Sequence, residues 1–315
     1  MAIIDKNIDL AIEVLNNGDV VGIPTETVYG LAANALNIDA VTKIFEVKNR
    51  PTFDPLIIHT SSIERISEFV TELPPKAIEL AQKFMPGPLT LLLPKKNIIP
   101  DLVTSGLDNV AVRIPNHPLT LQLLQKIDFP LAAPSANPFG YISPTTAQHV
   151  EAQLGDKIKY ILDGGECNVG IESTIVGFVN DEVVVYRKGG LSIELIEEVV
   201  GKVRIEAHST SNPQAPGMLK SHYSPRKKFI ISDETIQPNT RAGFLGFKDY
   251  KAEIPTENQL LLSPNGDFAE AAKNLFAYLR KLDAMDIDVI YGEYLPEKDL
   301  GRAINDRLRR ATVQE

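Results

Sequence analysis

Short apolar runs alternate with amphipathic segments of helical length over the first 200 residues, and this alternation constrains the fold most strongly. Runs of about four to eight residues rich in Val, Ile and Leu are typical of strands. The alternation predicts an α/β (α+β) fold in which helices pack on a mixed, twisted sheet, with the strand order left open. We expect strands near residues 20–23, 56–60, 89–96, 109–115, 130–137, 160, 174 and 183, and helices near 39–48, 62–71, 75–84, 117–127, 145–154 and 191–200.

The composition changes after about Gly201. Residues 208–225 are rich in Ser, Pro and Asn without apolar periodicity, which indicates a linker. We therefore expect a larger domain over 1–205, a linker over 206–226 and a smaller three-layer α/β domain over 227–315. In that smaller domain, strands are expected at 228–232, 242–247, 259–263 and 288–295, and helices at 267–282 and 301–311.

The net charge of the chain is -9 at pH 7, which argues against nucleic-acid binding through bulk positive charge. Residues 1–18 are interpreted as a short amphipathic helix and not as a signal peptide. No apolar run approaches the roughly 18 residues that a membrane span needs. The single cysteine, Cys167, cannot form an internal disulfide, and the histidines lack metal-ligand spacing. These features favour a cytoplasmic location.

A polar loop interrupts the apolar stretch over residues 21–33. Pro24 has no backbone N–H for a sheet, so the strand before it is expected to end there. Thr25, Glu26 and Thr27 follow, and the loop then presents two hydroxyls and a carboxylate, as a substrate-gripping loop does. An ordinary turn in which Thr25 or Thr27 acts as a cap remains an alternative at this point.

Cations stand at the ends of three predicted elements. Lys48 and Arg50 follow a helix, Arg113 ends one strand, and Arg187 with Lys188 ends another. Each placement alone has an ordinary explanation, because cations complement a helix C-terminus and long side chains reach water from strand ends. Together the three sets predict an anion-binding pocket, since the arginine fork matches phosphate oxygens.

Hydroxyl and amide side chains lie on loops that follow strands of the same domain. Ser135, Asn137 and Ser143 belong to APSANPFGYIS, and Ser173 belongs to GIESTIVG. Such loops commonly bind ligands in α/β folds. Ser135 lacks the G-x-S-x-G elbow of a hydrolase nucleophile, and the sequence contains no P-loop motif. His59, at the end of LIIHT, is either a structural strand-end residue or a ligand-binding one.

Motifs that follow one another along the chain carry a resemblance to a known family. The segments PTETVYGL, KNRP, PLIIH, MPGPLTLLL, VAVRIP, APSAN and ESTIV resemble the YrdC-like family of L-threonylcarbamoyladenylate synthases. The segments APGMLKSHYSP and GRAINDRLRRA resemble its longer branch, which has an additional C-terminal domain. The resemblance implies a nucleotidyltransferase that converts ATP, L-threonine and bicarbonate into threonylcarbamoyl-AMP and pyrophosphate. The product serves the threonylcarbamoyl-adenosine modification of tRNA next to the anticodon.

The resemblance also implies roles for individual residues, with Lys48, Arg50 and Arg113 as catalytic residues. Magnesium would accompany ATP, the linker would act as a lid, and a tRNA threonylcarbamoyl transferase complex would take the product. The family commonly has Asn where this chain has Asp54, whose negative charge would weaken a contact with phosphate. Threonine and bicarbonate would contact Thr25, Thr27, His59, Arg113, Ala133 and Ser173. ATP would contact Lys48, Arg50, Asp54, Asn109, Ser135, Asn137, Ser143, Arg187 and Tyr223.

Two other functions remain as alternatives at this point. An RNA-binding module could use Arg307, Arg309 and Arg310 near the end of the chain, although the overall acidity argues against it. A carbamoyltransferase that uses carbamoyl phosphate would resemble related domains of hydrogenase-maturation proteins, which carry acylphosphatase-like and zinc-finger parts that this chain lacks. The sequence leaves open the oligomeric state and the role of the second domain.

Overall fold

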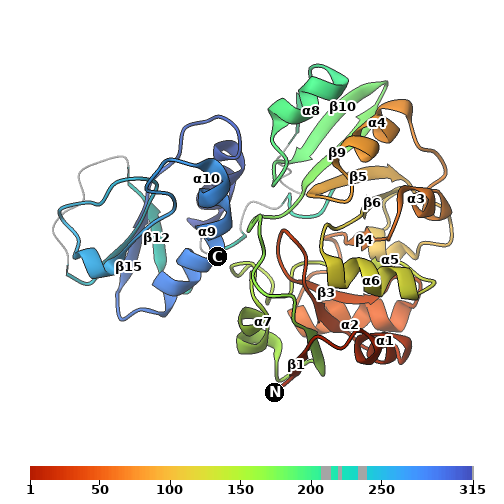
Figure 1. The fold of residues 1–315 in the computed structure, drawn as a ribbon, viewed down its shortest axis with the longest axis horizontal. Coiled ribbons are helices and arrows are strands. Elements are labelled where there is room, and N and C mark those ends of the chain that lie inside the picture. Colours follow the sequence, from red (N-terminus) through yellow and green to blue (C-terminus); the bar gives the residue numbers. More distant parts are fainter. Residues whose placement is uncertain (207–213, 219–221, 233–239, 314–315) are drawn as a thin grey trace.

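The computed structural model describes residues 1–206, 214–218, 222–232 and 240–313. The chain forms two units, each built around its own β-sheet, and the smaller unit lies beside the larger one (Figure 1). The N-terminal part of the chain forms the larger unit, and the part from β12 onward forms the smaller one. The α/β (α+β) fold with a second, smaller domain is therefore confirmed.

The larger unit contains an eleven-stranded mixed sheet with the order β1-β8-β2-β3-β7-β4-β6-β5-β9-β10-β11. Parallel and antiparallel pairs alternate irregularly across it; β4 and β6 are parallel, for example, whereas β5 and β6 are antiparallel. The strands are β1 (Ile3–Asp5), β2 (Val21–Ile23), β3 (Gly30–Asn34), β4 (Ile57–His59), β5 (Leu89–Pro94), β6 (Asn109–Arg113), β7 (Leu131–Ala132), β8 (Tyr160–Leu162), β9 (Thr174–Val179), β10 (Glu182–Arg187) and β11 (Arg204–Ile205).

Helices of the larger unit lie at most of the predicted positions. One prediction is wrong: residues 1–18 do not form a single helix, because β1 pairs in parallel with β8 before the first helix begins. The helices are α1 (Ile8–Asn16), α2 (Ile38–Lys48), α3 (Ile63–Phe69), α4 (Pro75–Phe84), α5 (Asp101–Thr104), α6 (Pro118–Lys126), α7 (Ala147–Leu154) and α8 (Ile193–Val200).

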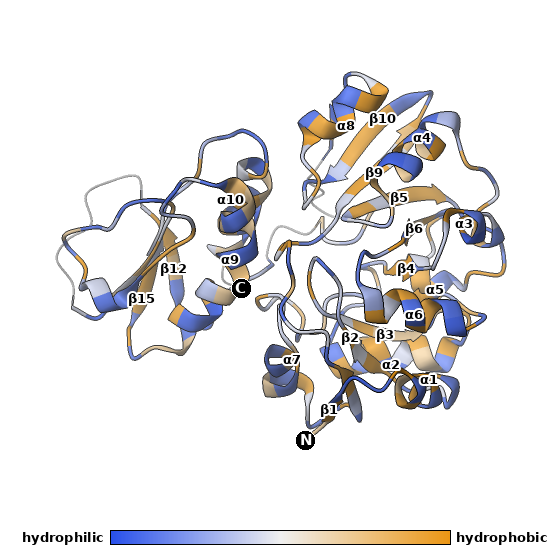
Figure 2. Cartoon of the chain, viewed as in Figure 1, coloured by the Kyte–Doolittle hydropathy of each residue, from blue (hydrophilic) through white to orange (hydrophobic). Residues whose placement is uncertain are grey.

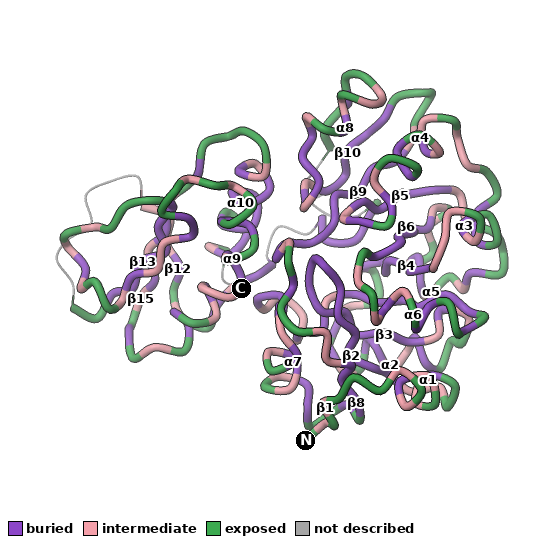
Figure 3. Tube along the Cα trace, viewed as in Figure 1, coloured by how far each residue is buried: buried purple, intermediate pink, exposed green. Residues whose placement is uncertain are grey.

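Apolar side chains cover both faces of the large sheet, and the alternation along each strand assigns them to a face. In β8, Tyr160 and Leu162 pack in one cluster with Leu15 of α1, whereas Ile161 packs in the other with Ile44 of α2. Figure 2 shows the apolar colour concentrated in the strands and on the inner sides of the helices. Figure 3 shows the same strands as buried. The sheet is therefore a rigid support for the loops that leave its edges.

The smaller unit is a four-stranded parallel sheet with the order β12-β15-β13-β14. Helices α9 and α10 pack against it and against each other, on the side that faces the larger unit (Figure 1). Phe244 of the sheet forms a small separate cluster with Ile254, and a short 3-10 turn, η1 (Thr256–Asn258), contacts β13. The elements are β12 (Lys228–Ile231), β13 (Ala242–Gly246), β14 (Gln259–Leu261), β15 (Val289–Gly292), α9 (Phe268–Ala284) and α10 (Gly301–Ala311).

Polar contacts fix the two units against each other. Arg280 of α9 donates to the carbonyl oxygens of Ile142 and Ser143 in the larger unit. The hydroxyl of Tyr141 donates to Asp283 Oδ2 at 2.6 Å. The helices of the smaller unit therefore lie directly behind the loop after β7. Over the described residues, no helix has the length and apolar character needed to cross a membrane.

Candidate active site

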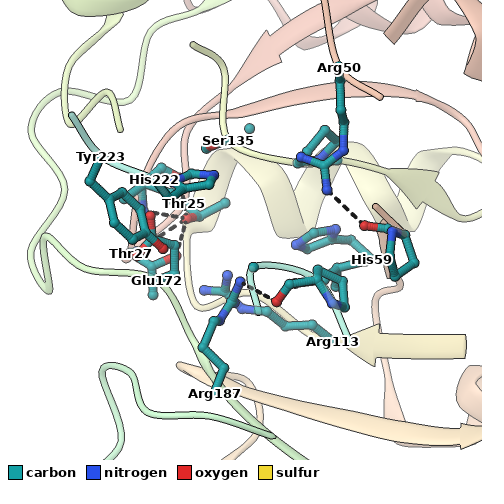
Figure 4. A pocket seen from close by; sticks show the side chains of 18 residues that line it. Thr25, Thr27, Arg50, His59, Arg113, Ser135, Glu172, Arg187, His222 and Tyr223 are labelled. Atoms are coloured by element: carbon teal, nitrogen blue, oxygen red, sulfur yellow. Dashed lines mark hydrogen bonds between the residues drawn. The ribbon is translucent and has the colours of Figure 1, made fainter. Parts of the chain in front are cut away.

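A pocket opens in the larger unit where the carboxyl ends of β4 and β6 meet the loop between β2 and β3 (Figure 4). The last residues of these strands, His59 and Arg113, pair in parallel register. Both side chains therefore reach the same edge of the sheet, and both line the pocket. The space between its walls is about 580 Å³, including the part open to solvent.

Thr25 holds the loop after Pro24 in shape. Its hydroxyl donates to the carbonyl oxygen of Val28 at 2.6 Å and accepts the backbone N–H groups of Thr27 and Val28. The hydroxyls of Thr25 and Thr27 lie 2.8 Å apart, and both residues line the pocket. Thr25 therefore organises a turn, as the alternative interpretation held, and this turn forms one wall of the pocket.

Two arginines line the pocket while paired with buried carboxylates. Arg50 Nη2 lies 2.8 Å from Asp54 Oδ2, and Arg113 Nη2 lies 2.8 Å from Glu26 Oε1. Burial lowers the pKa of Arg50, and the charge of Asp54 partly offsets this effect. An anionic ligand that enters the pocket would compete with the two carboxylates for the guanidinium N–H groups.

Arg187 supplies a third cationic wall (Figure 4). Its Nε donates to the carbonyl oxygen of Ser173 and its Nη2 donates to Ser173 Oγ, each at 3.0 Å. Ser173 Oγ lies 2.7 Å from Thr90 Oγ1. Burial lowers the pKa of Arg187 to about 10, which leaves the guanidinium protonated at neutral pH. Ser173 therefore lies behind the lining and orients Arg187.

Two uncharged imidazoles complete the polar lining. Burial and the nearby charge of Arg113 lower the pKa of His59 to about 3. Burial and several cations, with Arg310 the strongest, hold the pKa of His222 well below its usual range. Within the described residues, the Nδ1 atoms of both rings are buried without a hydrogen-bond partner. Neutral imidazoles with free ring nitrogens suit hydrogen bonding to a ligand, not charge neutralisation.

Tyr223 closes the pocket from the side of the linker. Its backbone lies in the left-handed region with φ of 68°, and its ring stacks on Phe276 of α9 at 5.2 Å between centroids. The ring of His222 lies 4.1 Å from that of Tyr223. The smaller unit therefore supports this wall, although none of its own residues belongs to the lining described.

The structure brings most of the predicted site residues together. Some of these residues line the pocket, and others lie behind the lining and contact the loops that form it. Lys48 is of the second kind, because it donates to the carbonyl oxygens of Ser135 and Asn137. The predicted residues that line the pocket are Thr25, Thr27, Arg50, His59, Arg113, Ala133, Ser135, Arg187 and Tyr223. Those behind the lining are Lys48, Asp54, Asn137, Ser143 and Ser173.

Asn109 is the exception among the predicted residues. It begins β6, whereas Arg113 ends it, so about 13 Å of extended backbone separates the two positions. Asn109 lines a different pocket, together with Leu93, Phe178 and Tyr186. The described structure therefore does not bring Asn109 to the pocket that holds the three arginines.

Sequence reasoning missed several residues of the lining. Glu172 and His222 both line the pocket. Each directly precedes a residue that was predicted for the site, Ser173 and Tyr223 respectively, and this adjacency is the sequence signal that could have identified them. Pro216 and Gly217 belong to the linker and also line the pocket. The proposed lid over 206–226 falls partly outside the described residues, but its described residues 216, 217, 222 and 223 reach the site.

Comparison with known proteins identifies the family. A family described as "Telomere recombination", which groups Sua5, YciO and YrdC proteins, matches residues 13–189, more than half of the chain. The chain belongs to the Sua5/YrdC family. A second family, described as the C-terminal domain of threonylcarbamoyl-AMP synthase, matches residues 191–313. The first match therefore covers most of the larger unit, and the second covers α8, β11 and the smaller unit.

Full-length relatives support the same assignment. A protein of Pyrococcus abyssi named threonylcarbamoyl-AMP synthase is 41% identical over 97% of this chain and 94% of its own length. A Bacillus subtilis protein of the same name is 37% identical over 98% of this chain and 93% of its own length. The crystal structure of P. abyssi Sua5 complexed with L-threonine superimposes with a TM-score of 0.90 at 39% identity, covering 99% of this chain and 98% of that one.

Proposed function

We propose that this Sua5/YrdC protein is a threonylcarbamoyl-AMP synthase, which uses ATP, L-threonine and bicarbonate and releases pyrophosphate. The observation that carries the proposal is the convergence of Arg50, Arg113 and Arg187 on one pocket beside the Thr25–Thr27 loop. Three guanidinium groups suit a reaction whose substrates each carry an anionic group: the phosphates of ATP, the carboxylate of threonine, and bicarbonate. The near-complete match to a Sua5 structure that contains L-threonine supports the same conclusion.

The chemistry requires orientation and charge neutralisation rather than a protein nucleophile. Bicarbonate takes up a proton and loses water to give CO2. The ammonium group of threonine loses one proton to become a nucleophilic amine, and it releases a second proton as its nitrogen bonds to CO2, which gives a carbamate. A carbamate oxygen then bonds to the α-phosphorus of ATP while the bond to the β-phosphate breaks and pyrophosphate leaves. In this proposal Arg113 binds the threonine carboxylate, and Arg50 and Arg187 bind phosphate groups.

Exclusion of water is the second requirement, because a carbamate decomposes in water. Pro216, Gly217, His222 and Tyr223 lie over the arginines as part of the pocket wall. We therefore propose that the linker acts as a lid over the reacting groups. One of its described residues contacts a residue behind the lining, since the backbone nitrogen of Gly217 lies 3.5 Å from Asp54 Oδ1.

Magnesium is proposed to enter with ATP, bound to phosphate oxygens and water. The described residues contain no group of three His, Cys, Asp or Glu side chains suited to a metal ion. The carboxylates at the pocket are engaged as well: Asp54 with Arg50, and Glu26 with Arg113. An ion that keeps most of its water ligands and binds chiefly to the nucleotide fits such a site.

The product is proposed to pass to a tRNA threonylcarbamoyl transferase complex in the cytoplasm. The RNA-binding alternative loses two of its three arginines, because Arg307 and Arg310 are only 1% and 5% exposed and contact acidic residues, whereas Arg309 is exposed. The carbamoyltransferase alternative has no support in the named full-length relatives, which are synthases.

Pyrophosphate release tests the proposed function. The purified protein is given ATP and magnesium with and without L-threonine and bicarbonate, and release is expected only when both are present. Arg113→Gln should raise the KM for L-threonine by roughly 30-fold, because it removes a charge-assisted contact with a carboxylate. Arg204→Gln is the control, since Arg204 is an exposed residue of β11. Pyrophosphate release that does not depend on L-threonine would contradict the proposal. The absence of pyrophosphate release from a folded protein would also contradict it.

A further inference from the structure

Glu172 is the acidic residue of the pocket lining described above, yet its carboxylate is engaged on the outer side of that wall. Its Oε1 accepts the hydroxyl of Ser143 at 2.6 Å. Its Oε2 accepts two N–H groups of Arg307, from Nε at 3.1 Å and from Nη2 at 3.0 Å. Neither Ser143 nor Arg307 belongs to the lining, so both carboxylate oxygens are held by groups behind it.

Arg307 comes from α10 of the smaller unit and reaches across to the larger one. It is 1% exposed, and its Nη1 also donates to the carbonyl oxygen of Lys188 in the loop after β10. The guanidinium lies 5.6 Å from the ring centroid of Tyr223, another residue of the lining. A long basic side chain of the second domain is therefore fully enclosed directly behind the catalytic pocket.

The charge of Glu172 is fixed by these neighbours. Burial alone would raise the pKa of this carboxyl, but Arg307, Arg187 and the Ser143 hydroxyl outweigh burial and hold the pKa below its usual value. Glu172 is therefore anionic. Without Arg307, a buried negative charge would stand in the wall of a pocket that receives phosphate groups, and like charges repel strongly where water is excluded.

We propose that Arg307 is a positioning residue of the second domain, which holds and neutralises Glu172 so that the pocket accepts the phosphates of ATP. This inference rests on the proposed function for the identity of the anion. The nucleotide is favoured over threonine because Ser143 and Tyr223, which adjoin the Arg307–Glu172 pair, are among the residues that the family resemblance assigns to ATP. The second domain thus contributes to substrate binding without touching the substrate.

A second ion pair between the two units provides a matched control. Arg302, on the same helix, lies 3.2 Å from Glu194 of α8, and both side chains are partly exposed, at 32% and 43%. This pair links the units as the Arg307–Glu172 pair does but does not adjoin the pocket lining. Arg302→Gln therefore measures the effect of losing a contact between the units alone.

The test is a double-mutant cycle in the full-length protein, with the Kd of ATP measured by calorimetry in the absence of threonine. Arg307→Gln should weaken ATP binding about tenfold, which corresponds to about 1.4 kcal/mol. Glu172→Gln combined with Arg307→Gln should restore the Kd to within threefold of the wild type. Arg302→Gln should leave the Kd unchanged.

Thermal unfolding is recorded for every variant. If Arg307→Gln lacks a cooperative transition, Arg307→Lys replaces it in the cycle, and a smaller loss that Glu172→Gln reverses is expected. An unchanged Kd in the Arg307 variant, or a loss that Glu172→Gln fails to reverse, would overturn the inference. Failure of the proposed function would be seen separately, as a wild-type protein without threonine-dependent pyrophosphate release.

Discussion

The carboxylate of Asp54 lies 2.8 Å from the guanidinium of Arg50, and both side chains are buried at the pocket. The pair places a negative charge beside a cation that we assign to phosphate. Asp54 and ATP therefore compete for Arg50, and the competition gives the first prediction.

Asp54→Asn should strengthen ATP binding about threefold, because Arg50 is then released from a carboxylate that it must otherwise share. The same change should lower the free energy of unfolding without ligand by about 3 kcal/mol, since it leaves a buried guanidinium without its counter-charge. Calorimetry and urea denaturation measure the two effects. Asp101→Asn is the control, because Asp101 forms an exposed ion pair with Lys95. Weaker ATP binding by Asp54→Asn would show that the carboxylate assists the site.

His59 gives a prediction about pH. Its pKa is about 3 in the folded protein because of burial and of Arg113, against an ordinary value of 6.5. Between these two pH values His59 is protonated in the unfolded chain but neutral in the folded protein. The free energy of unfolding is therefore unaffected by this group at high pH and decreases as the pH falls below 6.5. From pH 7 to 5 the loss should be about 2 kcal/mol for this group. His59→Asn should remove that part of the pH dependence in urea denaturation, and an unchanged pH dependence would contradict the assignment.

Gly217 tests the fit of the linker over the pocket. Its φ is +75°, and a Cβ there would lie 3.1 Å from Arg187 Nη1. Gly217→Ala should therefore displace Arg187 or the linker and raise the KM for ATP roughly tenfold. Gly106→Ala is the matched control, because Gly106 has φ of +79° with no atom within 4 Å of the added Cβ. Equal effects of the two substitutions on the KM would show that backbone strain alone, and not the contact with Arg187, is responsible.

Cys167 gives a prediction about reactivity. The side chain is buried, and burial raises the pKa of its thiol, so little nucleophilic thiolate forms. Iodoacetamide at pH 8 should leave the native protein unmodified and alkylate it fully in urea, as mass spectrometry would report. Rapid alkylation of the native protein would indicate an opening of the region around Cys167.

The sequence allowed the main elements to be predicted because their signals are local. The apolar run before His59 and the one before Arg113 each mark a strand, and two parallel strands bring their ends to one edge. The strand β1 was not predictable in this way. Three residues form a strand there only because β8, distant in the sequence, offers an edge for pairing.

The polar network behind the pocket depends on the same kind of distant contact. Arg307 and Glu172 are 135 residues apart, and each has an ordinary local interpretation, as part of a basic helix and as a neighbour of Ser173. The position of Asn109 away from the arginine pocket has a related cause. A motif places a residue on a strand, but the direction of that strand decides which end reaches the ligand.

The enclosed position of Arg307 also has a consequence for synthesis of the protein on the ribosome. Glu172 emerges 135 residues before its partner. The last pocket strand, β10, is complete at Arg187, 120 residues before Arg307, so at roughly 10 residues per second the nascent chain holds all pocket strands for roughly 12 s while the Glu172 carboxylate lacks Arg307. A half-made enzyme of this kind would bind nucleotide more weakly than a chain whose second domain has been made and has docked.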